Sequence, residues 1–212
     1  MHQTYKTNGT CSTQIDFDIE DNKIYNLKFT GGCNGNLKGI AALVEGEDIT
    51  TVKNKLKGIK LHFRIFEYPT SSQAETIYQI IKNYHIEGQI FIKDADSMYV
   101  CDKEIKGNAV MVYSLENTPI VDPQHKSYVA IDDQNFVTNI IEKKVVSNLF
   151  NCGGYSFASA LDFIEAYEHV LEFEDIFSHM YISHIIYWLI LNKKLKFRPI
   201  EAIGYEDFEI KQ

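Results

Sequence analysis

Residues 90–97 read Ile-Phe-Ile-Lys-Asp-Ala-Asp-Ser, a short β-branched and aromatic run that stops in two carboxylates, Asp94 and Asp96. An apolar run of this length, bounded by turn residues, is typical of a buried parallel strand. In open α/β sheets ligands bind beyond the carboxyl ends of the strands, so both carboxylates are expected at a ligand-binding edge. They are suitable oxygen ligands for a magnesium ion that also contacts substrate phosphates. The alternative is that they only form a turn after the strand.

Strand and helix patterns alternate on both sides of this run. A capping box, Ser72-x-x-Glu75, opens a helix that continues to Tyr84. Strand patterns are predicted at 61–66, 109–114, 127–131, 137–142, 153–157 and 197–203, and further helices at 158–170 and 175–191. This alternation predicts an α/β fold, with a mixed sheet between layers of flanking helices.

The pattern of residues 1–59 predicts a separate, small α+β module, which precedes an α/β domain at 60–212. Alternating segments at 13–17 and 24–29 flank the turn residues 20–22, which indicates a β-hairpin. A glycine-rich turn at 31–36 leads into a helical pattern at 37–44, and Asp48 can cap a second helix that ends near Gly58. The glycine-rich turn could bind an anion, but its spacing fits neither phosphate-binding motif, which favours a simple tight turn.

Composition and charge exclude several classes of protein. The chain has 212 residues and a net charge of −8, which disfavours general binding to nucleic acid or to anionic membranes. Residues 1–59 contain seven lysines and seven acidic residues, so the excess negative charge lies in the rest of the chain. No apolar segment has the length of a membrane span or the pattern of a signal peptide. The four cysteines form no C-x-x-C pair, so reduced thiols and a cytoplasmic location are expected.

The first 59 residues resemble a known family. The segments 5–12, 29–40 and 43–46, which include Thr-Gly-Gly-Cys-Asn-Gly-Asn-Leu-Lys-Gly at 30–39, look like the TSCPD domain. This domain occurs alone in bacteria and at the C-terminus of some ribonucleotide reductases. The Thr-Ser-Cys-Pro-Asp signature itself is absent, and only Cys11 and Cys33 match the family's four cysteines. Two thiolates do not complete a tetrahedral zinc site, and the spacing gives no reason to add Cys101 or Cys152.

Residues 61–207 resemble a second family, the nucleotidyltransferases of the sugar-nucleotide pyrophosphorylase type, which act in surface-polysaccharide pathways. The segments that carry the likeness follow in the family's order, at 69–76, 91–97, 126–129, 139–148, 153–157, 181–187 and 204–207. The resemblance implies a partial nucleotidyltransferase fold of the glycosyltransferase-A-like type. It also implies Mg²⁺-dependent transfer of a nucleotidyl group from a nucleoside triphosphate to a sugar or alcohol phosphate.

The same resemblance assigns roles by position. It implies that Asp94, Asp96 and Asp207 hold the metal ion and that Asp96 and Lys143 are catalytic. A second set is implied to bind substrates: Ser72, Gln73 and Ala74 the nucleotide, and Glu142, Lys143, Gly153, Gly154 and Tyr155 the sugar phosphate. Taken alone, the residues 142–144 fit a solvated strand end, and the two glycines fit a bulge or a close strand crossing. His179 and His184 lie five residues apart and do not share a helix face, so both are interpreted as ordinary helix residues.

Departures from the family pattern leave three functions open. The family's glycine-rich, basic loop after its first strand is missing, and its Trp-Gly-Thr is replaced by Phe208-Glu209-Ile210. We therefore expect catalysis by this chain to be impaired or lost, with an open sheet edge that can drive association, homo-oligomers included. The alternatives are a TSCPD-type binding protein related to ribonucleoside-diphosphate reductase, and a chimera without catalysis.

Overall fold

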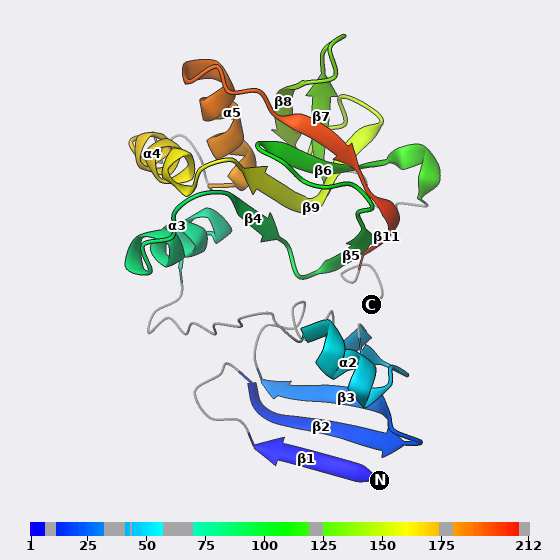
Figure 1. The fold of residues 1–212 in the computed structure, drawn as a ribbon. Helices are drawn as coiled ribbons and strands as arrows, with labels where there is room; N and C mark the ends of the chain where they lie inside the picture. The colour runs from blue at the N-terminus through cyan, green and yellow to red at the C-terminus, as the bar shows by residue number, and fades with distance from the viewer. Residues whose placement is uncertain are drawn as a thin grey trace. The chain divides into compact units, whose positions relative to one another are not determined.

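The chain divides into two compact units. In the computed structural model, residues 1–6, 12–31, 41–42, 44–56, 70–118, 125–173 and 180–207 are described. The first unit comprises Met1–Tyr68, Ala95–Met98 and Asp207–Gln212, and the second comprises Pro69–Asp94 and Tyr99–Glu206. Figure 1 labels the elements of both units. The boundary after residue 59 that we expect from the sequence stays a prediction.

Three antiparallel strands form the sheet of the first unit, in the order β1 (His2–Lys6), β2 (Ser12–Glu20) and β3 (Lys23–Gly31). The hairpin between β2 and β3 turns at Asp21 and Asn22, whose φ angles are +46° and +64°. A two-residue turn with positive φ at both positions matches the twist of the flanking strands. The predicted hairpin is therefore present, with longer strands than the sequence pattern indicates.

Helix α2 (Ile49–Leu56) follows the sheet in the first unit. It begins where the sequence predicts, because Asp48 Oδ1 accepts hydrogen bonds from the backbone N–H groups of Thr50 (2.8 Å) and Thr51 (3.2 Å). These bonds satisfy donors that have no partner within the helix. The predicted helix at 37–44 and the glycine-rich turn lie largely or wholly outside the described residues, as do Cys11 and Cys33.

A six-stranded mixed sheet organises the second unit. Its strands run in the order β10-β6-β9-β7-β8, with β4 paired to β9, and β10 with β6 is a parallel pair among antiparallel ones. Strands β5 and β11 form a separate pair. The elements are α3 (Gln73–Asn83), β4 (Ile90–Lys93), β5 (Ser97–Val100), β6 (Ala109–Ser114), η1 (Leu115–Asn117), β7 (Ser127–Ile131), β8 (Val137–Glu142), β9 (Leu149–Phe157), α4 (Ala160–Leu171), α5 (Ile182–Asn192), β10 (Arg198–Glu201) and β11 (Ile203–Asp207).

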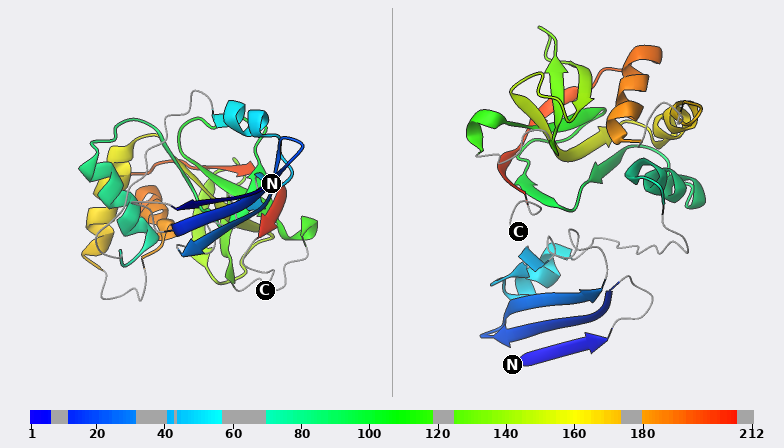
Figure 2. Two further views of the ribbon diagram at one scale, coloured as in Figure 1. Left: turned by 90° about the horizontal axis from the view of Figure 1, so that it is seen from below. Right: turned by 180° about the vertical axis from the view of Figure 1, so that it is seen from behind.

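Two apolar clusters pack against this sheet. Alternation along β6 sends Val110 and Val112 into the larger cluster, which the helices share, and Met111 into the smaller one. Figures 1 and 2 show α3, α4 and α5 grouped on one side of the sheet. In the larger cluster the fully buried ring of Phe157 makes edge contacts with Phe163 and Phe197, with ring centroids 5.1 Å and 5.8 Å apart. The expected mixed sheet with helices is confirmed, but the expected helix layers on both faces are not, because the smaller cluster contains no residue of α3, α4 or α5.

The environment of β4 corrects one prediction. The strand lies where expected, but it pairs antiparallel with β9 and its residues alternate between half-buried and exposed. Phe91 is 44% exposed. The apolar run predicted a buried parallel strand, whereas among the described residues β4 has only β9 as a neighbour, so its apolar side chains are covered less completely.

Other differences concern short or polar elements. Strands β1 and β5 have no counterpart among the predicted strands, and the predicted strand 61–66 lies outside the described residues. His179 also lies there. In the part of the chain that is described, no helix is long and apolar enough to cross a membrane.

Ser72 provides a test of how α3 is held. Its side chain accepts a hydrogen bond of 3.1 Å from the backbone N–H of Glu75. We expect Ser72→Ala to lower the free energy of unfolding by about 1 kcal/mol, the usual cost of losing an N-cap. Urea unfolding measures this loss. Equal stability of Ser72→Ala and the unsubstituted protein would contradict the assigned cap.

Candidate functional site

The start of α3, the end of β4 and a bulge in β9 meet at one place, the β4–β9 junction, defined by Gln73, Lys93, Asp94, Gly153 and Gly154. The backbone N–H of Asp94 donates a 2.8 Å hydrogen bond to the carbonyl oxygen of Gly153. The side-chain amide of Gln73 donates to Asp94 Oδ1. Three candidates from distant parts of the sequence are therefore joined, and the Asp94 carboxylate is held in a fixed position.

Both glycines of the junction are required by close contacts. A Cβ at Gly153, where φ is +82°, would lie 2.8 Å from both Cβ and Oδ2 of Asp94. A Cβ at Gly154 would lie 2.0 Å from the hydroxyl oxygen of Tyr99 and 2.4 Å from Cγ of Met111. The bulge is visible in the pairing of β9 with β6, which shifts between Val110 and Val112. The alternative interpretation of the two glycines, a bulge or a close strand crossing, is therefore observed, and it lies at the candidate site itself.

Tyr99 fills the space behind Gly154. Its hydroxyl is buried and finds no hydrogen-bond partner among the described residues. Burial is the main cause that raises the pKa of this phenol, so the group is neutral at physiological pH. The ammonium of Lys93 lies 4.7 Å from the centroid of the Tyr99 ring and also donates to the backbone carbonyl of Asp94. The junction therefore combines one carboxylate, one ammonium group and a neutral phenol.

Cys152 lies beside the junction and gives a second prediction. Its side chain is 2% exposed, and burial raises the pKa of the thiol from 9.0 to about 12. Because the thiolate is the reactive form, we expect Cys152 to resist iodoacetamide at pH 8 in the folded protein and to react after denaturation. Stability should fall as the pH rises from 9 toward 12, since the unfolded thiol ionises first.

Peptide mass spectrometry after alkylation measures this protection, with the half-exposed Cys101 as the internal reference. Equal rates of modification at the two thiols in the folded protein would contradict the buried position of Cys152.

A second group of candidates lies at the end of β8. The Glu142 carboxylate accepts a 2.7 Å hydrogen bond from the hydroxyl of Ser127. Lys143 follows with φ at +56°, and its backbone N–H donates to the carbonyl oxygen of Lys126 (2.9 Å). Its ammonium lies 5.6 Å from the centroid of the Tyr181 ring, and a hydrogen bond with Tyr181 is the main cause that raises the pKa of Lys143. A cation is therefore held at the strand end next to an anion.

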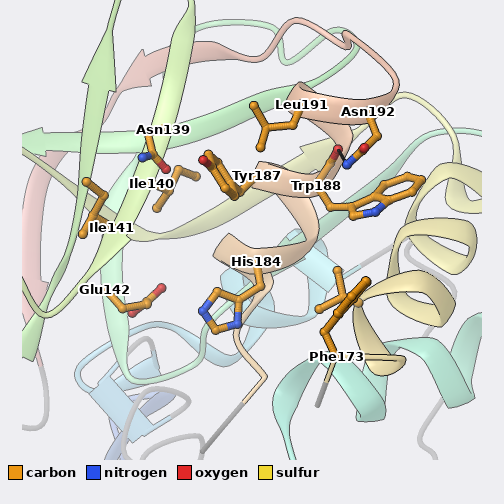
Figure 3. A pocket seen from close by; sticks show the side chains of 11 residues that line it. Asn139, Ile140, Ile141, Glu142, Phe173, His184, Tyr187, Trp188, Leu191 and Asn192 are labelled. Atoms are coloured by element: carbon orange, nitrogen blue, oxygen red, sulfur yellow. Dashed lines mark hydrogen bonds between the residues drawn. The ribbon is translucent and has the colours of Figure 1, made fainter. Parts of the chain in front are cut away.

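A pocket of about 490 Å³ adjoins Glu142 (Figure 3), and we call it the β8–α5 pocket. Strand β8, helix α5 and the residues that end α4 line it. Most of its lining is apolar or aromatic, and the polar side chains include Asn139, Glu142 and His184. Burial lowers the pKa of His184, so its imidazole is neutral at physiological pH. From the sequence we interpret His184 as an ordinary helix residue. Its spacing of five residues from His179 gives no sign that it lines a pocket.

The remaining candidates take up different positions. Ser72 is the N-cap of α3, and Ala74 is completely buried, so its side chain is not exposed for contact with a ligand. The Tyr155 ring belongs to the larger apolar cluster. Asp96 and Asp207 fall within the first unit, whereas Asp94 falls within the second. Among the described residues, no three His, Cys, Asp or Glu side chains gather as a metal site. The metal set stays a prediction.

The comparisons with known proteins agree with both resemblances. Residues 3–85 match the TSCPD domain family, a match that runs past residue 59 into α3. No curated protein matches the chain.

Solved structures match over most of the chain. A nucleoside-diphosphate-sugar pyrophosphorylase from Vibrio cholerae RC9 has a TM-score of 0.61 at 20% identity, over 76% of this chain and 72% of that one. A candidate glucose-1-phosphate thymidylyltransferase from Bacillus anthracis, solved with sucrose, has a TM-score of 0.52 at 15% identity, over 76% and 67% of the two chains. At these identities the likeness establishes a nucleotidyltransferase-like fold.

Proposed function

We propose that the second unit binds a nucleoside triphosphate and a sugar or alcohol phosphate, and that it derives from an enzyme of nucleotidyl transfer in sugar-nucleotide or surface-polysaccharide metabolism. The observation that carries the proposal is the β4–β9 junction, where Gln73 donates to Asp94 and Asp94 packs on Gly153. Three residues assigned to nucleotide, metal and sugar phosphate are adjacent there, on a fold that is similar to sugar nucleotidyltransferases. A cytoplasmic location and the lack of binding to nucleic acid or membrane stay predictions from the sequence.

The proposed reaction is an in-line displacement at phosphorus. A phosphate oxygen of the acceptor attacks the α-phosphorus of the nucleoside triphosphate and forms a new P–O bond. The bond between the α-phosphorus and the bridging oxygen to the β-phosphate breaks, and pyrophosphate leaves with the electron pair. Catalysis of this kind depends on positioning and on positive charge near the phosphates. Lys143 supplies that charge for the acceptor phosphate. Ser72 and Gln73 at the start of α3 contact the nucleotide in this proposal, with the buried Ala74 behind them.

Magnesium is the cofactor that this proposal implies. Carboxylate oxygens are the ligands it prefers, and one or two of them suffice when substrate phosphates complete the shell. Asp94 fits this role because Gln73 fixes one of its oxygens. The roles of Asp96 and Asp207 stay predictions from the family resemblance. When bound, the ion would neutralise charge on the phosphates.

We also propose that transfer by this chain is slow or lost. The family's basic, glycine-rich loop is missing from the sequence, and a single electrostatic group in such a site is worth roughly 10²–10³ in rate. Binding needs fewer groups than catalysis, so it is expected to survive better.

The proposal is tested by pyrophosphate release from each nucleoside triphosphate with magnesium and a panel of sugar and alcohol phosphates. A low rate that depends on one nucleotide and one acceptor is expected. Lys143→Met should reduce this rate by roughly 100-fold, because the charge on the acceptor phosphate is lost. The neighbouring exposed Lys144→Met is the matched control and should retain the rate. Release that is equal in both variants would exclude the role of Lys143.

A second function is favoured by the TSCPD match at residues 3–85. In this alternative the first unit is the working part, and the chain is a binding protein related to ribonucleoside-diphosphate reductase. Saturable binding of a purified reductase, together with no heat for any nucleoside triphosphate, would support this alternative. If both experiments failed, a chimera without catalysis would remain.

A further inference from the structure

The β8–α5 pocket has a charge that restricts its ligand. Glu142 is the acidic residue of its lining, and its carboxylate has only the neutral hydroxyl of Ser127 as a hydrogen-bond partner among the described residues. His184 does not compensate this charge. Its Nδ1 accepts a 3.3 Å hydrogen bond from the backbone N–H of Tyr181, and burial favours the neutral ring. Lys143 interacts with the Glu142 carboxylate but is not part of the described lining, so within the pocket the carboxylate favours a positive charge over a negative one.

Aromatic rings form part of the pocket wall. Phe173, Tyr187 and Trp188 line the same pocket, and Figure 3 shows them with Glu142 and His184 around it. Tyr187 is 39% exposed and Phe173 51% exposed, so both rings are accessible to a ligand. One face of Trp188 stacks on His169, with the ring centroids 4.9 Å apart. Aromatic faces attract organic cations, and quaternary ammonium groups are recognised by such surfaces.

The remaining lining disfavours a small, strongly hydrated cation. Ile140, Ile141, Val170 and Leu191 cover much of the wall, and the amide side chains of Asn139 and Asn192 add two neutral polar groups. A small inorganic cation would lose most of its water shell in such a site, at a large cost in hydration free energy. An alkylated ammonium group is weakly hydrated, so this cost is small. A volume of about 490 Å³ is also in the range of small organic ligands.

We propose that the β8–α5 pocket binds an organic ammonium group, and that the acceptor of this chain is a phosphorylated amino alcohol. The ammonium group lies against Glu142 and the aromatic rings, and the phosphate lies toward Lys143, the next residue along the chain. The identity of the acceptor rests on the proposed function, whereas binding of the ammonium group does not. Among sugar and alcohol phosphates, this selects acceptors with a positive charge.

Trp188 makes the pocket directly observable, because it is the only tryptophan of the chain. The full-length protein is titrated with choline while tryptophan fluorescence is recorded, and then with 3,3-dimethylbutan-1-ol, which has the same shape without the charge. Saturable binding of choline with at least about tenfold preference over the neutral alcohol is expected, because the carboxylate and the aromatic faces attract only the charged ligand. Equal affinities, or tighter binding of methyl glucoside than of choline, would overturn the proposal.

Two variants separate the contribution of the Glu142 carboxylate to choline binding from that of the aromatic rings. Glu142→Gln retains an acceptor for Ser127 and should remove the preference for choline while leaving the affinity for the neutral alcohol unchanged. Tyr187→Leu should weaken choline by roughly two- to fivefold, as expected for one cation–π contact. Glu87→Gln, an exposed carboxylate that does not line the pocket, is the control and should behave like the unsubstituted protein. A preference that persists in Glu142→Gln would contradict the role of its carboxylate.

No nucleotide is present in this experiment, so its outcome is independent of nucleotidyl transfer. Choline binding without any nucleotide binding would support the pocket and refute the transferase function. Nucleotide binding without choline binding would refute the pocket and leave the transferase function in place. Phosphocholine in the pyrophosphate-release assay then tests the acceptor itself, and a rate below that of every sugar phosphate would overturn its assignment.

Discussion

Asp94→Asn is expected to weaken the binding of a magnesium–nucleotide complex by roughly 100-fold, the upper range for groups that hold or orient a metal ligand. The substitution removes the negative charge but keeps the shape of the side chain. Its oxygen can still accept from Gln73, and its backbone N–H can still donate to Gly153. The fold should therefore be retained, and the loss should be confined to binding that requires the metal.

Isothermal calorimetry with and without magnesium measures this effect. Asp133→Asn, which changes an exposed carboxylate in the turn between β7 and β8, is the matched control and should leave binding unchanged. Gln73→Leu should give a smaller loss, about tenfold, because Asp94 would keep its charge but lose its orientation. Unchanged affinity in Asp94→Asn would remove this carboxylate from the proposed site.

Gly154→Ala is expected to destabilise the second unit by ~3 kcal/mol, the upper range for overpacking a core. The new methyl group would need the space of the Tyr99 hydroxyl, 2.0 Å away, and of Cγ of Met111, 2.4 Å away. Tyr99 is partly buried and packs against the smaller apolar cluster, which contains Met111, so neither group moves without disturbing its neighbours. The melting temperature should fall by several degrees, at about 2–4 °C per kcal/mol.

Tyr99→Phe provides the control for this clash. The hydroxyl that it removes has no hydrogen-bond partner among the described residues, so the single substitution should cost little. In the double variant, the loss caused by Gly154→Ala should shrink by at least ~0.5 kcal/mol, the scale of coupling between residues in contact. Additive effects in urea unfolding would show that the two side chains do not compete for this space.

Local sequence signals predicted much of the fold because they act within a few residues. The turn at Asp21 and Asn22 and the caps Asp48 and Ser72 lie where turn and capping chemistry place them. Elements without apolar periodicity were missed. Strand β1, for example, reads His-Gln-Thr-Tyr-Lys and contains one large apolar ring. Such a strand is specified by pairing with β2, which a local pattern does not reveal.

Long-range contacts account for what the sequence could not predict. The run 90–93 has the composition of a buried parallel strand, but its neighbour and direction depend on β9, more than fifty residues later. The packing of Tyr99 on Gly154 is likewise distant in sequence, and the only local signal was the pair of glycines. His184 joined the β8–α5 pocket because α5 packs beside β8, which its spacing from His179 does not indicate.

The proposed function requires that the second unit retains a site for a nucleotide with its metal. Calorimetric titration of the unsubstituted, full-length chain with each nucleoside triphosphate, in the presence and absence of magnesium, tests it most directly. We expect saturable binding of one nucleotide with a stoichiometry near one, and loss of that binding when magnesium is removed. No binding heat for any nucleoside triphosphate in magnesium would contradict it.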